Sequence, residues 1–314
     1  MIVTTGSKPI PAKFGEIEMK MPNFLIIGAA KSGTTALYHA LKQHPQIYMS
    51  PVKEPRFFTF EGKRPDYCGP GDDQFASGCV INLQDYLRLF EEAEHQIAIG
   101  EASVTYLRLS ETSSQRIQHY IPHVKLIAVL RQPAERAYSI YTMRVAAGRE
   151  WLSFAQALQA EEERQQMNWS PDWTYKASGY YYRFLQPYFE RFPREQIRIY
   201  LYEDWQTKSP EVLQDIFRFL QVDNTFVPEV GKHNVTRWPR SRAIQALLTK
   251  PHELKTWLKP LLPPRLRGAI QSLSYRRPPS LDPELHRQLT ECYREDILKL
   301  QDLIGRDLSH WLKT

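Results

Sequence analysis

Apolar runs alternate with helical patterns of apolar positions along most of the chain. Mostly apolar runs with the length of buried parallel strands cover 24–28, 124–130 and 196–201. Helical spacing of apolar residues follows over 34–41, from 133 onward, over 212–220 and over 285–304. This alternation predicts an α/β fold, with a central parallel sheet and helices on both faces.

The turn between the first apolar run and its helix has the composition of an anion-binding loop. Gly28 and Gly33 flank four residues, and glycine allows close backbone approach and left-handed turn geometry. The amides at the start of the following helix, from Thr34, have no partner within the helix, and the helix dipole adds positive potential there. We therefore expect one phosphate-like group to bind at this turn.

The position of the lysine decides which anion the loop favours. In the nucleoside triphosphate loop the lysine directly follows the second glycine, whereas here Thr34 follows Gly33 and Lys31 lies inside the loop. The segment resembles the 5′-phosphosulfate loop of sulfotransferases that use 3′-phosphoadenosine 5′-phosphosulfate (PAPS), in the branch of the heparan sulfate enzymes. The resemblance implies a P-loop-like three-layer fold. It also implies that the donor is bound by Lys31, Ser32, Gly33, Thr34 and Thr35.

A second strand-to-helix junction follows the run 124–130. Arg131 stands at the end of the predicted strand, where open α/β sheets bind ligands, and its guanidinium matches phosphate. The spacing of Arg131 and Ser139 resembles the 3′-phosphate motif of the same family, which implies that both residues hold that phosphate. The alternative is that Arg131 forms a structural ion pair and Ser139 faces a neighbouring helix.

The segment 50–58 contains two prolines and is predicted to be constrained and non-helical. It resembles the K-E-x-x-F-F segment of the heparan-type enzymes, which implies that Glu54 is the general base and that Lys31 stabilises the departing phosphate oxygen. Arg56 stands where some relatives carry histidine, and Thr59 replaces an acidic residue found in some of them.

The stretch 99–106 also resembles the family, but Ala102 stands where the glycosaminoglycan enzymes carry a donor-binding lysine. Lys31 alone, or Ser103 with a backbone amide, are the candidates to compensate for it. For Glu101, two interpretations stay open: it orients a neighbouring cation, or it is a surface charge at the end of a strand.

Length and composition fit one large α/β domain. The chain has 314 residues with 42% apolar content, and we expect a loose leader over 1–20 and a single domain over 21–314. No run approaches about 18 consecutive apolar residues. Cys68, Cys79 and Cys292 lack metal-ligand spacing, which favours a reducing compartment, so a cytoplasmic location is expected.

The positive charge is concentrated near the C-terminus. The net charge is +6, and residues 237–277 hold ten Lys or Arg against Glu253 alone. This region is a candidate for contact with a membrane surface or an acidic polymer, and no module that reads nucleic acid accompanies it. It includes Arg237 and Arg240, which fall where relatives have a basic loop that closes over the donor.

The resemblance therefore implies a PAPS-dependent sulfotransferase that needs no metal and releases 3′-phosphoadenosine 5′-phosphate (PAP). Its acceptor is expected to be a hydroxyl or amine of a carbohydrate or small metabolite. Two alternatives stay open: a P-loop kinase or nucleotidase that depends on magnesium, and a non-catalytic module that binds acidic polysaccharide through its basic region.

Overall fold

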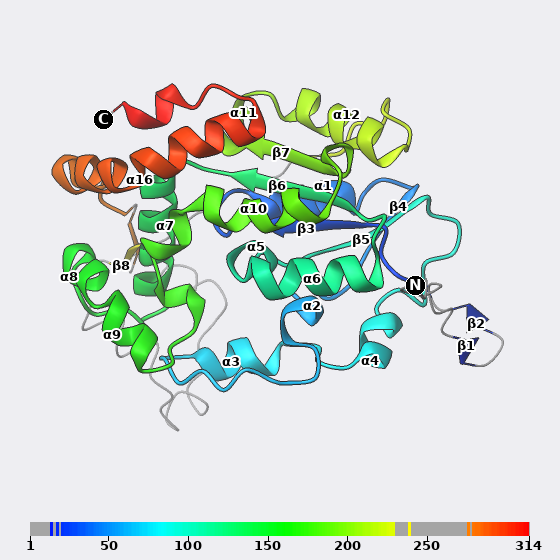
Figure 1. Ribbon diagram of the computed structural model, residues 1–314, viewed down its shortest axis with the longest axis horizontal. Helices are drawn as coiled ribbons and strands as arrows, with labels where there is room; N and C mark the ends of the chain where they lie inside the picture. The colour runs from blue at the N-terminus through cyan, green and yellow to red at the C-terminus, as the bar shows by residue number, and fades with distance from the viewer. Residues whose placement is uncertain are drawn as a thin grey trace, which may run out of the picture. The chain divides into compact units, whose positions relative to one another are not determined.

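Figure 1 shows the computed structural model of the chain, which describes residues 20–229 and 278–313 and the short strands at 13–14, 17–18, 238–239 and 275–276. The chain forms two compact units. The first comprises Met1–Pro65, Ala76–Leu130 and Arg183–Gly231, and the second comprises Asp66–Phe75, Arg131–Tyr182 and Lys232–Thr314. The prediction of one domain over 21–314 stays a prediction.

A five-stranded parallel sheet forms the centre of the first unit. Its strands, in spatial order, are β4 (Ile47–Met49), β5 (Ala98–Ala102), β3 (Phe24–Gly28), β6 (Lys125–Leu130) and β7 (Ile197–Leu201). Every neighbouring pair is parallel. The predicted central parallel sheet is therefore confirmed, including the three strands that the apolar runs indicated.

The strand order places a topological switch point at β3. The chain leaves β3 for β4 and β5 on one side and later returns to β6 and β7 on the other. In open parallel sheets, ligands bind beyond the carboxyl ends of the strands where the order reverses in this way. The loop after Gly28 begins at this point.

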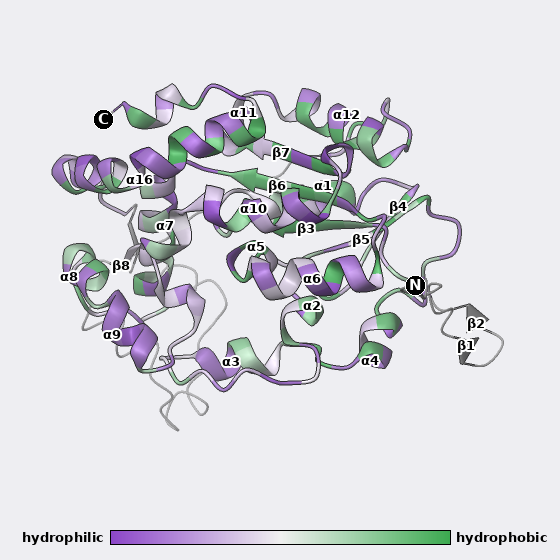
Figure 2. Cartoon of the chain, in the orientation of Figure 1, coloured by the Kyte–Doolittle hydropathy of each residue, from purple (hydrophilic) through white to green (hydrophobic). Residues whose placement is uncertain are grey.

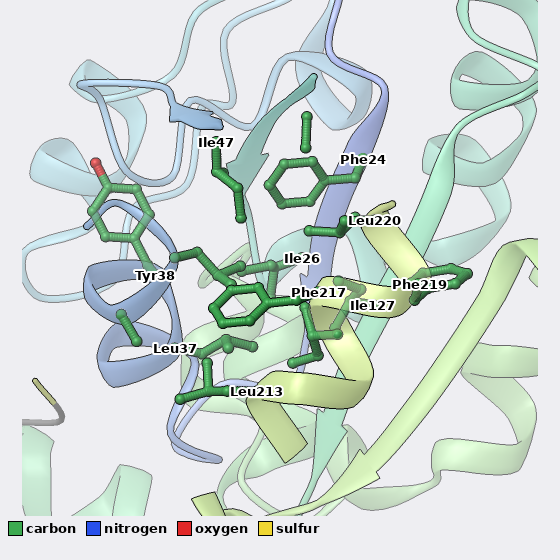
Figure 3. Close-up of a cluster of buried hydrophobic side chains, with 14 of the residues drawn as sticks. Phe24, Ile26, Leu37, Tyr38, Ile47, Ile127, Leu213, Phe217, Phe219 and Leu220 are labelled. Atoms are coloured by element: carbon green, nitrogen blue, oxygen red, sulfur yellow. The ribbon is translucent and has the colours of Figure 1, made fainter. Parts of the chain in front are cut away.

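Both faces of the sheet are buried. Phe24, Ile26 and Ile127 belong to a core cluster shared with helices α1 (Thr34–Leu41) and α12 (Ser209–Leu220). Figure 3 shows Leu37 of α1 and Leu213 and Phe217 of α12 among the strand side chains.

The alternate residues of the central strands, among them Leu25 and Leu126, are also fully buried. Since successive strand residues point to opposite faces, helices must cover the second face as well. Helix α5 (Thr105–Arg108) contacts β3, and Figure 1 shows α5 beside α6 (Ser110–Tyr120) in front of the sheet. Figure 2 shows β3 and β6 as strongly hydrophobic, as burial on two faces requires.

Shorter helices complete the first unit. They are α2 (Phe57–Phe60), α4 (Leu83–Arg88), α11 (Tyr202–Thr207) and a 3₁₀ helix over Arg194–Gln196. Two helices, α3 (Asp72–Ser77) and α10 (Tyr181–Arg191), contain residues of both units. Within the predicted leader, β1 (Lys13–Phe14) and β2 (Ile17–Glu18) pair antiparallel.

The second unit is mainly helical. Its helices are α7 (Pro133–Ala146), α8 (Phe154–Gln159), α9 (Glu161–Gln166), α16 (Pro283–Ile304) and 3₁₀ helices over Pro171–Trp173, Ala177–Gly179 and Ser309–Leu312. Strands β8 (Trp238–Pro239) and β9 (Tyr275–Arg276) pair antiparallel. Helix α7 contacts both α16 and β8.

Hydrogen bonds pair the buried Glu150 and Arg164 of the second unit, whereas Nε of the buried Arg136 and Arg144 has no hydrogen-bond partner among the described residues. The Glu150 carboxylate accepts bonds from Arg164 Nη1 at 2.7 Å and Nη2 at 3.0 Å, and from the Tyr175 hydroxyl at 2.7 Å. Arg136 Nη2 donates to the Tyr175 carbonyl oxygen at 2.6 Å. Such pairing is what makes buried ionic groups tolerable, so this cluster has a structural explanation.

Gly100 of β5 gives a test of the sheet packing. It lies opposite Phe24, and a Cβ at position 100 would lie 2.4 Å from the Phe24 ring. We expect Gly100→Ala to lower the free energy of unfolding by about 1–3 kcal/mol through overpacking. Denaturant titration of purified protein measures this change.

The double variant Gly100→Ala/Phe24→Leu is the control, because leucine lacks the distal ring carbons that an alanine Cβ would meet. It should lose less stability than the two single variants combined. Strict additivity of the two losses would contradict the steric explanation.

Candidate active site

The loop after β3 forms an open helix N-terminus. The Ala29 amide donates to the Val129 carbonyl oxygen at 2.7 Å, which ties the start of the loop to β6. Lys31 has a φ of 67° and Gly33 a φ of 88°, so the backbone turns through the left-handed region twice before α1 begins at Thr34. Among the residues that the structure describes, no side chain caps α1. Its first amides therefore have no side-chain acceptor in this part of the chain, and anion binding there stays a prediction.

Gly33 is required for both conformation and space. A left-handed φ favours glycine, and a Cβ here would lie 3.0 Å from Cδ1 of Trp205 and 3.3 Å from Cδ2 of Tyr202, both on α11. A side chain at this position would press into α11 at the point where the amides of the helix start must stay accessible.

Ser32 carries an unsatisfied polar group inside the loop. Its side chain is fully buried, and its hydroxyl has no hydrogen-bond partner among the described residues. A buried hydroxyl without a partner costs about 1–3 kcal/mol, so native structures rarely retain one without a reason. A ligand oxygen bound in the loop would supply the missing partner.

The predicted base, Glu54, lies in a turn held by the end of β5. Glu54 and Arg56 have φ values of 67° and 58°, both left-handed. The Glu54 amide donates to the Ala102 carbonyl oxygen at 2.9 Å, and the Arg56 amide donates to Ser103 Oγ at 3.1 Å. Helix α2 begins immediately after this turn, so the predicted non-helical segment ends at Arg56 rather than at 58.

The Glu54 carboxylate is fixed by three neighbours. Its Oε2 accepts a hydrogen bond from the Val104 amide at 3.0 Å, and its Oε1 accepts one from Lys53 Nζ at 2.8 Å. Arg56 Nε lies 3.9 Å from Oε2. The Glu54 side chain keeps 17% exposure, so it is anchored but still reachable from solvent.

Strained backbone concentrates at these positions. Five non-glycine residues of the described chain have a positive φ, and three of them are Lys31, Glu54 and Arg56. Each left-handed non-glycine residue costs about 1–3 kcal/mol and persists only where its surroundings enforce it, and such residues cluster at functional sites. Because β5 and β3 are neighbours, the Lys31 loop and the Glu54 turn are anchored to adjacent strand ends.

Glu101, the only charged residue in β5, is completely buried. Its Oε1 accepts hydrogen bonds from the Tyr106 hydroxyl at 2.5 Å and the Tyr86 hydroxyl at 3.4 Å, and its Oε2 accepts one from Ser103 Oγ at 2.9 Å. Both sequence interpretations of Glu101 are wrong, because its partners are hydroxyl groups rather than a cation and it has no exposed surface. The sequence signal for this burial is that Glu101 is a single acidic residue within an otherwise apolar strand.

Burial raises the pKa of the Glu101 carboxyl to about 7, although its hydrogen bonds from Tyr106, Ser103 and Tyr86 act to lower it. The nearby Glu54 adds to the rise. Burial also raises the pKa values of Tyr86, Tyr106 and Tyr188 well above the ordinary range, so these hydroxyls stay protonated as donors.

The other predicted donor-binding residues belong to the second unit or lie outside the described residues. Arg131 directly follows β6, as predicted, and its Nη2 forms an ion pair with Glu135 Oε2 at 3.0 Å. Ser139 is partly buried. The roles of Arg131 and Ser139 stay predictions. Arg237, Arg240 and most of 237–277 lie outside the described part of the chain.

Two further properties concern metals and membranes. Within the described ranges, no group of three or more His, Cys, Asp or Glu side chains is placed to hold a metal ion. The reaction's independence of metal stays a prediction. None of the helices in these ranges combines the length and the apolar character needed to cross a bilayer.

The fold and the loop together define a P-loop-like α/β protein whose α1 begins at the switch point of the sheet. The sequence profile described as "Sulfotransferase domain" matches residues 21–240, well over half of the chain. The chain therefore belongs to the sulfotransferase family. The predicted sulfotransferase family and the predicted fold class are confirmed, and the use of PAPS as donor stays a prediction.

Three known proteins illustrate the relationship. A solved sulfotransferase from Alicyclobacillus acidocaldarius is 32% identical with a TM-score of 0.75, over 94% of this chain and all of that one. Mouse carbohydrate sulfotransferase 15 is 28% identical over 64% of this chain, and human bifunctional heparan sulfate N-deacetylase/N-sulfotransferase 2 is 27% identical over 94% of it. The matches span only 44% and 31% of those two relatives' own lengths.

The buried Glu101 predicts a dependence of stability on pH. Its pKa in the folded state, about 7, lies above the ordinary value of 4.5, so the folded state holds the proton more tightly than the unfolded state. This contribution to stability is complete below about pH 4.5 and is lost as the pH rises to about 7, by roughly 3 kcal/mol in total. Glu101→Gln cannot ionise, so its stability relative to the wild type should improve over this interval.

Denaturant titrations of both proteins at about pH 5 and about pH 8 measure the effect. Glu162→Gln, which changes an exposed residue of α9, is the matched control and should show no comparable change. Equal responses of the Glu101 and Glu162 variants to pH would contradict the buried-carboxyl explanation.

Proposed function

We propose that the chain transfers the sulfuryl group of PAPS to a hydroxyl or amine of an acceptor, and that this acceptor is a carbohydrate or small metabolite. One observation carries the proposal: an open anion-binding loop and a fixed, reachable carboxylate are anchored to the ends of the neighbouring strands β3 and β5. Membership of the sulfotransferase family supports the same reaction class.

The loop fits the sulfated end of the donor. The uncapped start of α1 offers the amides of Gly33, Thr34 and Thr35, and the buried hydroxyl of Ser32 needs a partner. Lys31 adds positive charge within the loop. The phosphate and sulfate oxygens of a phosphosulfate accept such bonds, and a donor bound there supplies an activated sulfuryl group.

In this proposal the 3′-phosphate of the donor is held by Arg131 and Ser139, with Arg237 and Arg240 closing over the nucleotide. The Arg131–Glu135 ion pair is compatible with this role, because the Arg131 side chain remains 21% exposed and guanidinium has five donors to share. PAP is the product that leaves this site.

Glu54 acts as the general base on the acceptor. It takes the proton of the attacking hydroxyl or amine as the new bond to sulfur forms and the bond from sulfur to the phosphate oxygen breaks. The negative charge that develops on that phosphate oxygen is stabilised by Lys31 and the loop amides. Lys53 and the Val104 amide keep the Glu54 carboxylate aimed while the acceptor arrives.

The relatives support the proposal of a carbohydrate acceptor. The mouse relative is a carbohydrate sulfotransferase and the human relative includes a heparan sulfate N-sulfotransferase, so both oxygen and nitrogen acceptors on sugars are candidates. The basic region 237–277 is proposed to contact an acidic polymer or a membrane surface, and nucleic acid is not an expected partner. A cytoplasmic location stays a prediction.

Removal of the base tests the reaction. We expect Glu54→Gln to reduce radiolabelled sulfate transfer from PAPS by about 10²–10⁴-fold, since the amide cannot accept the proton. Lys31→Ala should reduce transfer by about 10²–10³-fold through the loss of charge at the leaving oxygen. The acceptor panel contains an N-deacetylated heparan-type polysaccharide, an unsulfated chondroitin-type polysaccharide and small phenols.

Glu162→Gln and Lys42→Ala serve as controls, because both residues are exposed and Lys42 lies at the far end of α1 from the loop. PAP binding should persist in Glu54→Gln. Full turnover in that variant would exclude Glu54 as the base, and magnesium-dependent phosphoryl transfer from ATP would favour the kinase alternative. Polysaccharide binding without any transfer would favour the non-catalytic module.

Ser32→Ala tests the donor loop separately. Removal of a buried hydroxyl without a partner should raise the stability of the ligand-free protein, by about 1 kcal/mol or more. The same change should weaken PAP binding because a hydrogen bond to the ligand is lost. Thermal unfolding with and without PAP measures both effects, and a lower stability without ligand would contradict this assignment.

A further inference from the structure

The three residues that follow Glu101 hold the Glu54 turn at consecutive positions. Ala102 accepts a hydrogen bond from the Glu54 amide, Ser103 accepts one from the Arg56 amide, and Val104 donates one to the Glu54 carboxylate. The turn is thus attached to the end of β5 by its backbone on both sides of the carboxylate and by the carboxylate itself.

The turn needs such support because its backbone is strained. Glu54 and Arg56 both lie in the left-handed region, which non-glycine residues adopt only when the surroundings enforce it. Relaxation of either residue would redirect the Glu54 side chain. The bond from the Arg56 amide to Ser103 is therefore a direct control on where the carboxylate points.

Glu101 determines how the Ser103 hydroxyl is oriented. Ser103 Oγ donates to Glu101 Oε2 at 2.9 Å, which turns its lone pairs toward the Arg56 amide. Because Glu101 Oε2 is the acceptor of this bond, the Ser103 hydroxyl hydrogen points to Glu101 and not toward the Arg56 amide. The hydroxyls of Tyr106 and Tyr86 hold the other carboxylate oxygen, and all four side chains are buried at 0% exposure.

This chain of contacts also reaches the donor loop. The Ser103 amide donates to the Ile26 carbonyl oxygen at 3.0 Å, two residues before the glycine that opens the loop. Ser103 therefore links β3, the strand that precedes the Lys31 loop, to the turn that contains Glu54.

We propose that Glu101 is a positioning residue that acts through Ser103: it fixes the hydroxyl that holds the Arg56 amide, and so aims the Glu54 carboxylate at the acceptor. This inference rests on the proposed function of Glu54 as the base. Neither Glu101 nor Ser103 touches the reacting groups. Their effect falls on the rate of the chemical step rather than on donor binding.

The test compares Ser103→Ala and Glu101→Gln with Ser113→Ala. Ser113 is an equally buried serine whose hydroxyl bonds the Thr59 side chain, outside the Glu54 turn. We expect Ser103→Ala to lower kcat by roughly ten- to a hundredfold, as small misplacements of catalytic groups do, with PAP affinity within about threefold of the wild type. Glu101→Gln, which preserves shape, should lower kcat by a smaller factor, and Ser113→Ala should leave it unchanged.

Amide hydrogen exchange supplies a readout that needs no enzymatic activity. In Ser103→Ala the Arg56 amide should exchange at least about tenfold faster, while the amides of β3 keep their protection, since a local opening frees only the turn. Glu101→Gln should accelerate the same amide without affecting β3. Faster exchange throughout the sheet would instead indicate general destabilisation and would overturn the positioning role.

Unchanged kcat and unchanged Arg56 exchange in both variants would also overturn the inference. A wild-type protein that transfers sulfate to none of the acceptors would refute the proposed function. In that case the exchange measurements alone decide whether Glu101 and Ser103 hold the turn.

Discussion

Burial of β3 on both faces and between two parallel neighbours is the constraint on which the rest of the structure depends. Because β3 and its neighbours are parallel, their carboxyl ends lie at the same edge of the sheet. The β3 loop, the Glu54 turn and the end of β5 are therefore brought to one edge by the sheet itself. The site needs no separate scaffold, because the core that stabilises the unit also sets the spacing of its functional segments.

At that edge, strained backbone residues produce sharp bends and hydrogen bonds stabilise them. Left-handed residues at Lys31, Glu54 and Arg56 produce bends that ordinary backbone would not adopt, and bonds from the ends of β5 and β6 hold those bends in place. The packing of the sheet offsets the free-energy cost of these strained bends. A carboxylate fixed before the acceptor arrives loses little entropy in the reaction, which is how a single glutamate can serve as an effective base.

Local patterns explain why much of this was predictable from the sequence. The apolar run before Gly28 and the spacing to Gly33 depend on neighbouring residues only, so the strand, loop and helix start followed directly, and Arg131 was placed correctly after β6. The role of Glu54 as base rests on resemblance and stays a prediction, since a lone glutamate in a loop carries no local signature. Glu101 was misjudged because its burial depends on Tyr86 and Tyr106, whose approach arises only from tertiary packing.

The buried Glu101 shows how stability and function compete in this unit. A carboxyl group with a pKa of about 7 inside the core weakens the folded state at neutral pH, and an apolar residue in its place would avoid that penalty. An apolar residue could not accept a hydrogen bond from the Ser103 hydroxyl, and so it could not orient that hydroxyl. A buried carboxyl group at Glu101 lowers stability at neutral pH, and its presence beside the strained turn is explained if the turn must hold Glu54 in one orientation. The unsatisfied Ser32 hydroxyl is a second local loss of stability, and it lies in the loop proposed to bind the donor.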